Sequence, residues 1–100
     1  MDTQKEAKIQ KQIIDYLKKV PNLYFIKTIV SNRRGIPDIH LCYRGMYVAL
    51  EVKREGEDAT ALQEYELSQI RKAGGFALVV RSVEDVRQVI ETLDLQISKQ

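Results

Sequence analysis

The sequence predicts one α/β domain over residues 1–100, in which a mixed sheet of four strands is flanked by helices. The 100 residues are enough for one small domain and too few for two. Segments with the apolar period of a helix alternate with short runs of β-branched and aromatic residues, in the order α-β-β-β-α-β-α. The third and fourth strands are separated by a connection long enough for a crossover, so we expect them to run parallel.

Three segments have the apolar spacing of amphipathic helices. Residues 3–20 carry isoleucine and leucine along one helical stripe. Residues 62–73 form the second predicted helix, with Thr60 as its N-cap and a pair of glycines as its stop. Ser82 caps the third, which covers about residues 83–95.

Four runs have the composition of strands. They are residues 24–30, 36–43, 46–53 and 76–81. The last run is continuously apolar, which is typical of a buried strand. Pro37 has no N–H group to donate to a ladder, so it marks the beginning of the second strand.

Composition limits the classes of function. Hydrophobic residues make up 44% and charged residues 30%, and the net charge of +2 permits a polyanionic partner without demanding one. The single cysteine, Cys42, and the single histidine, His40, exclude an internal disulfide and a zinc site of several such ligands. We expect Cys42 to be a small buried residue. No apolar run exceeds five residues and the N-terminus is polar, so we expect no membrane span, no secretory signal and a cytoplasmic location.

The turn between the second and third strands sets the register of the predicted site. If Arg44 and Gly45 form a two-residue turn, paired positions sum to 89 and Asp38 faces Glu51. Lys53 lies two residues beyond Glu51 and therefore shares its face of the sheet. The two carboxylates and the lysine then meet at the end of the hairpin away from the turn.

Such a carboxylate pair needs a positive partner, because like charges directly opposite each other destabilise a sheet. Two carboxylates suit Mg²⁺ or Mn²⁺, and the backbone carbonyl of Val52 could be a further ligand. A bound ion of this kind can polarise a phosphodiester, while Lys53 stabilises the developing charge or orients water. The alternative interpretation is a pair of solvated carboxylates and a cross-strand salt bridge.

Two polar residues of the helices have both a functional and a structural interpretation. Glu6 lies in line with the apolar stripe of the first helix, where a metal ion or Lys53 would be its partner. It also fits a capping box with Thr3 in an exposed first turn. Gln63 either closes a capping box with Thr60 or lies at the edge of the site, since it shares an inward stripe.

These residues resemble a known nuclease signature. Residues 35–38 (GIPD), followed by residues 51–53 (EVK), resemble the PD-(D/E)XK motif. With the loop over residues 31–35 and the later helix that carries Gln63, the chain is similar to the VRR-NUC family, the virus-type replication-repair nucleases. The resemblance covers about residues 6–89, and the lack of an extra domain resembles the stand-alone phage members.

The resemblance implies a fold, a site and an activity. The fold would be a restriction-endonuclease-like αβββαβ core. Metal ligands would be Asp38, Glu51, the Val52 carbonyl and Glu6, while Lys53 would match the catalytic lysine and Gln63 the glutamine of the following helix. It implies a Mg²⁺- or Mn²⁺-dependent DNA endonuclease selective for branched or Holliday-junction-like DNA, and a homodimer.

The loop before Asp38 is the predicted DNA contact. Arg33 and Arg34, with Ser31 and Asn32, lie beside the acidic residues and could grip phosphates, although a solvated loop is the ordinary interpretation. The main alternative function is a non-catalytic nucleic-acid-binding module that keeps the nuclease fold. A third possible function is that of a structural or interaction protein. The intact set of two carboxylates and a lysine argues against it.

Overall fold

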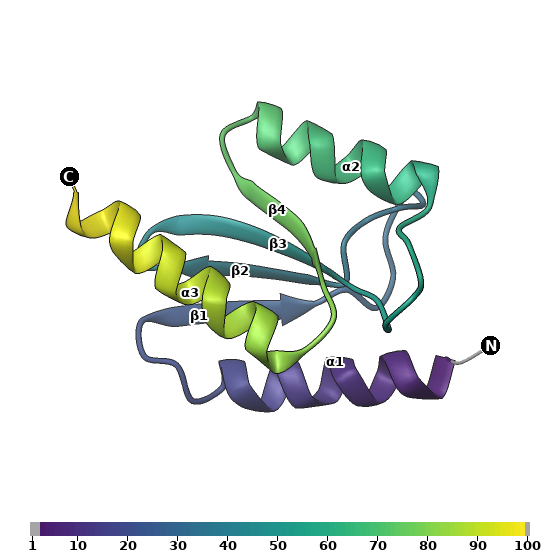
Figure 1. Cartoon of the computed structure of the whole chain (residues 1–100). Helices are drawn as coiled ribbons and strands as arrows, with labels where there is room; N and C mark the ends of the chain where they lie inside the picture. Colours follow the sequence, from purple (N-terminus) through teal and green to yellow (C-terminus); the bar gives the residue numbers. More distant parts are fainter. Residues whose placement is uncertain (1–2, 100) are drawn as a thin grey trace.

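A computed structural model describes residues 3–99, with the side chain of Thr3 excepted. It confirms the predicted order of elements (Figure 1). The elements are α1 (Thr3–Leu17), β1 (Leu23–Lys27), β2 (Ile39–Tyr43), β3 (Met46–Val52), α2 (Ala61–Lys72), β4 (Phe76–Val80) and α3 (Val83–Ser98). Among the described residues, no helix has both the length and the apolar character needed to cross a membrane.

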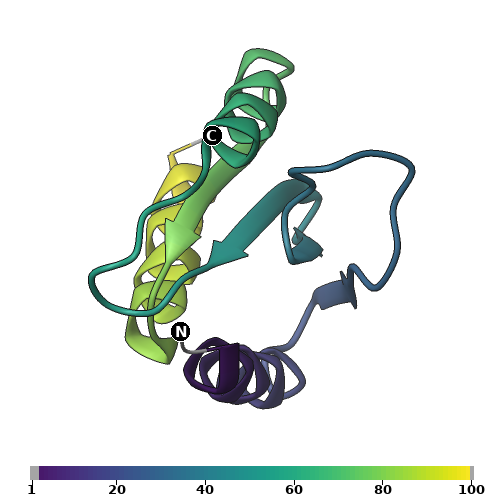
Figure 2. The same ribbon diagram turned by 90° about the vertical axis from the view of Figure 1, so that its right-hand side faces the viewer.

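The strands form the predicted mixed sheet, in the order β1-β2-β3-β4. β1, β2 and β3 pair antiparallel, and β4 pairs parallel to β3 after the α2 crossover. Figure 2 shows the helices on both sides of the sheet. The larger core joins α1 and α3 to one face through residues such as Ile13, Leu50 and Val86, all 0% exposed. On the other face Leu67 of α2 packs on Ala49 and Ala77.

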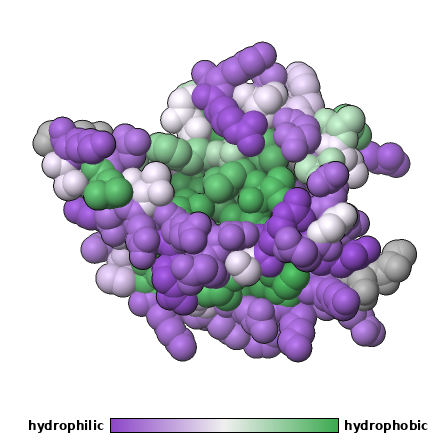
Figure 3. Space-filling model, viewed as in Figure 1, coloured by the Kyte–Doolittle hydropathy of each residue, from purple (hydrophilic) through white to green (hydrophobic). Residues whose placement is uncertain are grey.

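Helix α2 covers only the β3–β4 half of its face. The β1–β2 half is open, and Tyr24 is 71% exposed there. The expectation that Cys42 is buried is therefore wrong: it faces this uncovered half and is exposed. At the opposite edge, apolar side chains of β4 reach the surface between α2 and α3 (Figure 3). Arg71 covers part of that edge by donating from Nε to the Ala77 carbonyl oxygen at 2.8 Å.

Several element ends differ from the prediction for local reasons. The first helix ends at Leu17 and not at 20, because Pro21 follows shortly after and disfavours helical backbone before it. The strand predicted over 24–30 ends at Lys27, and β2 begins only at Ile39. Because Pro37 lacks an N–H, β2 offers no ladder beyond this point. The last helix continues to Ser98, since no glycine or proline stops it at Leu95.

The β2–β3 turn fixes the register that the site needs. Arg44 has φ 50° and Gly45 has φ 89°, the pair of positive angles that a type I′ hairpin turn requires. The strands pair as predicted, with Tyr43 opposite Met46 and Ile39 opposite Leu50. Asp38 therefore lies directly before β2, across from the end of β3.

Gly35 shapes the loop that leads to Asp38, and its replacement is our first prediction. Its φ is +86°, and an added Cβ would lie 2.7 Å from the Leu62 carbonyl oxygen. Gly35→Ala should lower the free energy of unfolding by about 2 kcal/mol or more, because left-handed strain and a backbone clash combine. Gly56→Ala is the matched control, since Gly56 has φ +85° with nothing within 4 Å. Equal urea midpoints for the two variants would contradict the clash.

Candidate active site

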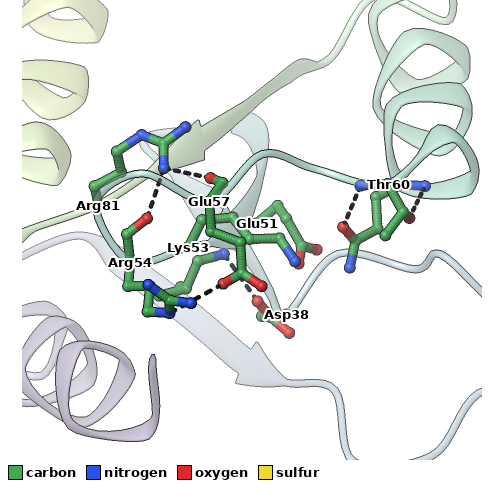
Figure 4. Close-up of polar contacts among 9 residues, drawn as sticks. Asp38, Glu51, Lys53, Arg54, Glu57, Thr60 and Arg81 are labelled. Atoms are coloured by element: carbon green, nitrogen blue, oxygen red, sulfur yellow. Dashed lines mark hydrogen bonds and ion pairs between the residues drawn. The ribbon is translucent and has the colours of Figure 1, made fainter. Parts of the chain in front are cut away.

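The structure brings Asp38, Glu51 and Lys53 together at one end of the β2–β3 hairpin (Figure 4). Glu51 and Lys53 are buried, with 3% and 7% of their surfaces exposed. The Nζ atom of Lys53 lies 3.9 Å from Oε2 of Glu51. Asp38 is half-buried, and its Oδ2 accepts a hydrogen bond from the Val52 N–H at 2.8 Å. The predicted convergence of these three side chains is therefore present.

The hairpin register explains why Val52 is placed for a role in the site. Continuing the pairing of Ile39 with Leu50 puts Pro37 opposite Val52 in the hydrogen-bonding position. Proline has no N–H for the Val52 carbonyl, and the Val52 N–H donates to Asp38 and not along the ladder. The ladder thus ends without a β2 hydrogen bond to the Val52 carbonyl oxygen. This oxygen is therefore placed to be a ligand of a metal ion.

Electrostatics single out Glu51. Its pKa is raised from 4.5 to about 8, first by burial and then by the neighbouring charge of Asp38, while Lys53 acts in the opposite direction. A hydrogen bond with Asp38 and the more distant charge of Glu6 raise it further. Without another cation, the site therefore holds a proton on Glu51 near neutral pH.

The donor set fits a divalent cation. Oε1 of Glu51 is buried and has no hydrogen-bond partner among the described residues. A buried carboxylate oxygen left unpaired is costly, and a hard cation would satisfy it together with Asp38 and the Val52 carbonyl. Within residues 3–99, no three His, Cys, Asp or Glu side chains form a group that could hold a metal. The carboxylate ligands that the site offers directly are thus Asp38 and Glu51.

Glu6 faces the site but pairs with a residue that the sequence did not point to. A hydrogen bond with Glu57 and partial burial raise the pKa of Glu6, and the charges of Lys53 and Asp38 also act on it. The same hydrogen bond lowers the pKa of Glu57. The role of Glu6 as a metal ligand remains a prediction. The alternative capping box with Thr3 involves a side chain outside the described part of the chain.

Glu57 is positioned by the loop that follows β3. Arg81 donates from Nη1 to the carbonyl oxygens of Arg54 and Glu57, at 2.8 and 2.6 Å, and so holds the loop against the end of β4 (Figure 4). The Arg54 Nε lies 3.7 Å from Glu57 Oε1. The two Arg81 hydrogen bonds join residues 24 and 27 positions apart, so the only sequence signal was the polar character of this stretch.

Gln63 takes its structural role in this structure. Its Oε1 accepts from the Thr60 N–H at 2.9 Å, and its own N–H donates to Thr60 Oγ1 at 3.2 Å, which completes the capping box. Figure 4 shows Thr60 apart from Asp38 and Glu51. A role at the edge of the site remains a prediction.

The two arginines of the loop before Asp38 differ in their contacts within the protein. Arg33 donates from Nε and Nη2 to the carboxylate of Glu66 in α2, at 2.9 and 3.1 Å. Ser31 Oγ donates to the Arg33 carbonyl at 2.6 Å. Arg34 is exposed and has no ion pair or hydrogen bond within the described residues. Arg34 is therefore the loop arginine that is available to a phosphate, and its contact with DNA remains a prediction, as does that of Asn32.

Comparison with known structures agrees with this class of site. A solved "VRR_NUC domain" is similar to the chain with a TM-score of 0.75 and 29% identity, covering 87% of this chain and 95% of that one. A "VRR_NUC domain protein" has a TM-score of 0.74 and 19% identity, over 92% and 89% of the two chains, which shows the fold alone. No family model and no curated protein matches the sequence.

The structure thus defines an α/β domain with a VRR_NUC-like nuclease fold. The comparison confirms the resemblance to the VRR-NUC family and the fold predicted from it. At 29% identity, the first of these structures supports a nuclease-like fold for this chain.

Proposed function

We propose that the protein hydrolyses phosphodiester bonds of DNA at the Asp38–Glu51–Lys53 site, with Mg²⁺ or Mn²⁺ as cofactor. The observation that carries the proposal is the buried Oε1 of Glu51, which has no hydrogen-bond partner in the described part of the chain and lies beside a second carboxylate and a buried ammonium. Metal-assisted hydrolysis needs this combination of an ion site and a fixed positive charge.

Each side chain has a separate task in this proposal. When bound, the divalent ion would polarise a phosphoryl oxygen and lower the pKa of water. Asp38, Glu51 and the Val52 carbonyl would hold it, with Glu6 as an outer member. Lys53 is buried, and its backbone N–H donates a hydrogen bond to the Val80 carbonyl oxygen. Its ammonium would stabilise charge on the phosphate.

We propose branched DNA as the preferred substrate and a homodimer as the active form. Two symmetric cuts across a junction need two sites related by a twofold axis. The exposed apolar side chains on and beside the open β1–β2 half support an interface there. They are Tyr24, Ile26, Ile29, Val30 and Tyr47.

Cleavage assays with wild type and Asp38→Asn test the proposed function. We expect wild type to cut branched and linear DNA only with Mg²⁺ or Mn²⁺, and the variant to lose at least about 100-fold in rate. Asp15→Asn is the matched control, because Asp15 is exposed and forms its ion pair with Lys11 on the surface of α1. Metal-independent binding without cleavage would instead favour the non-catalytic module, and equal cutting by both variants would refute the assigned site.

A further inference from the structure

A basic groove lies between α1 and the loop after β3. Its cavity volume is about 290 Å³. Cationic side chains from three parts of the chain line it, and these are Lys5 and Lys8 of α1, Arg54 of the loop, and Arg81 after β4. Glu55 is its one acidic lining residue. The four cations against one carboxylate make the groove suited to an anion.

The cationic side chains of the groove differ in their contacts with the rest of the protein. Arg81 is held by the two loop carbonyls and by Asp58, so its role in the fold is structural. Lys8 is exposed and makes no ion pair or hydrogen bond with any described residue. The Arg54 Nε is buried and has no hydrogen-bond partner within residues 3–99, although it lies 3.7 Å from Glu57. Among the described residues, Lys8 is therefore the unpaired cation that the groove offers to an anionic ligand, and the part-exposed Arg54 guanidinium, ion-paired with Glu57, adds positive charge beside it.

The groove and the candidate active site share a wall. Arg54 lines the groove on one side, and its ion-pair partner Glu57 interacts with Glu6 and Lys53 on the other. Ile9 adds an apolar surface to the groove, of the kind on which a sugar ring can pack. The groove is therefore adjacent to the candidate active site.

We propose that this groove binds a backbone phosphate of the nucleic-acid strand that is cleaved, through Lys8 and Arg54. The inference rests on the proposed function for its substrate. It adds a second contact region, on other elements than the Arg34 loop, that fixes the strand without reading its sequence. Glu55 opposes the anion and limits its affinity.

Binding of a DNA oligonucleotide, measured by anisotropy without divalent metal over a range of salt concentrations, tests the groove. Lys8→Gln should weaken binding about threefold or more near physiological salt and reduce the salt slope by about one. Glu55→Gln should tighten binding. Lys18→Gln is the matched control, because Lys18, directly after α1, is exposed like Lys8 but lies outside the groove. Titration with inorganic phosphate separates a strand contact from capture of free phosphate.

The outcomes separate the groove from the cleavage site. Weaker binding by Lys8→Gln, with an unchanged cleavage rate at saturating DNA and a raised KM, supports the groove. If Lys8→Gln and Lys18→Gln bind alike while wild type cleaves DNA, the groove is refuted and the proposed function stands. Tight binding of inorganic phosphate that DNA does not displace also refutes it. A wild type that neither binds nor cleaves DNA refutes both.

Discussion

Replacing Lys53 by methionine should lower the cleavage rate at saturating metal and DNA by roughly 10²–10³-fold, while Mn²⁺ still binds. The Lys53 ammonium lies 3.9 Å from the Glu51 carboxylate, and both groups are buried. Solvent therefore cannot compensate for the positive charge that the variant lacks. Removing a positive group beside the carboxylates does not remove a ligand. Metal affinity should therefore be kept or increased, as calorimetry would show.

The Lys53 prediction separates catalysis from folding. Lys53→Met leaves the Glu51 carboxylate without its nearby cation, which is costly in a buried site. Circular dichroism and the Mn²⁺ titration together show whether the variant is folded with its site intact. A folded Lys53→Met protein that cleaves at the wild-type rate would contradict the assigned role. So would one that loses Mn²⁺ binding as completely as it loses cleavage.

Stability without metal should fall as the pH rises, and this is the second large effect. Glu51 has a pKa of about 8 in the folded protein against 4.5 ordinarily, so the folded state binds more protons between these values. The stabilisation is complete below about pH 4.5 and is lost as the pH rises to about 8. Since one pKa unit corresponds to about 1.4 kcal/mol, the loss should be on the order of a few kcal/mol.

Urea unfolding at a series of pH values measures this effect. Glu51→Gln keeps the shape of the side chain and cannot ionise, so its stability should exceed that of wild type at pH 9 and change little with pH over this range. Glu91→Gln, on the exposed surface of α3, should follow wild type. A wild type whose stability is constant from pH 5 to pH 9 would contradict the raised pKa of Glu51.

The central part of the site could be predicted from sequence because it depends on local rules. The Arg44–Gly45 turn fixes the register of β2 and β3, and the alternation of a strand then sets which side chains share a face. Asp38, Glu51 and Lys53 follow from those two rules alone. The parallel pairing of β4 followed from the length of the crossover.

Other features depend on contacts between distant segments. Glu57 faces Glu6 because Arg81 holds the loop backbone, and no spacing rule relates these positions. In the same way, Arg33 is engaged by Glu66 of α2. The exposure of Cys42 depends on how far α2 extends across the sheet. Local periodicity carries no information on any of these arrangements.

Calorimetric titration of Mn²⁺ into the metal-free protein measures whether Asp38 and Glu51 together hold a divalent ion. We expect Mn²⁺ to bind to wild type, with affinity at least about tenfold weaker in both Asp38→Asn and Glu51→Gln, because each variant loses a charged ligand. Lys53→Met should bind as well as wild type or better. Absence of Mn²⁺ binding to wild type, or equal affinity in wild type and Glu51→Gln, would contradict the assignment of this site.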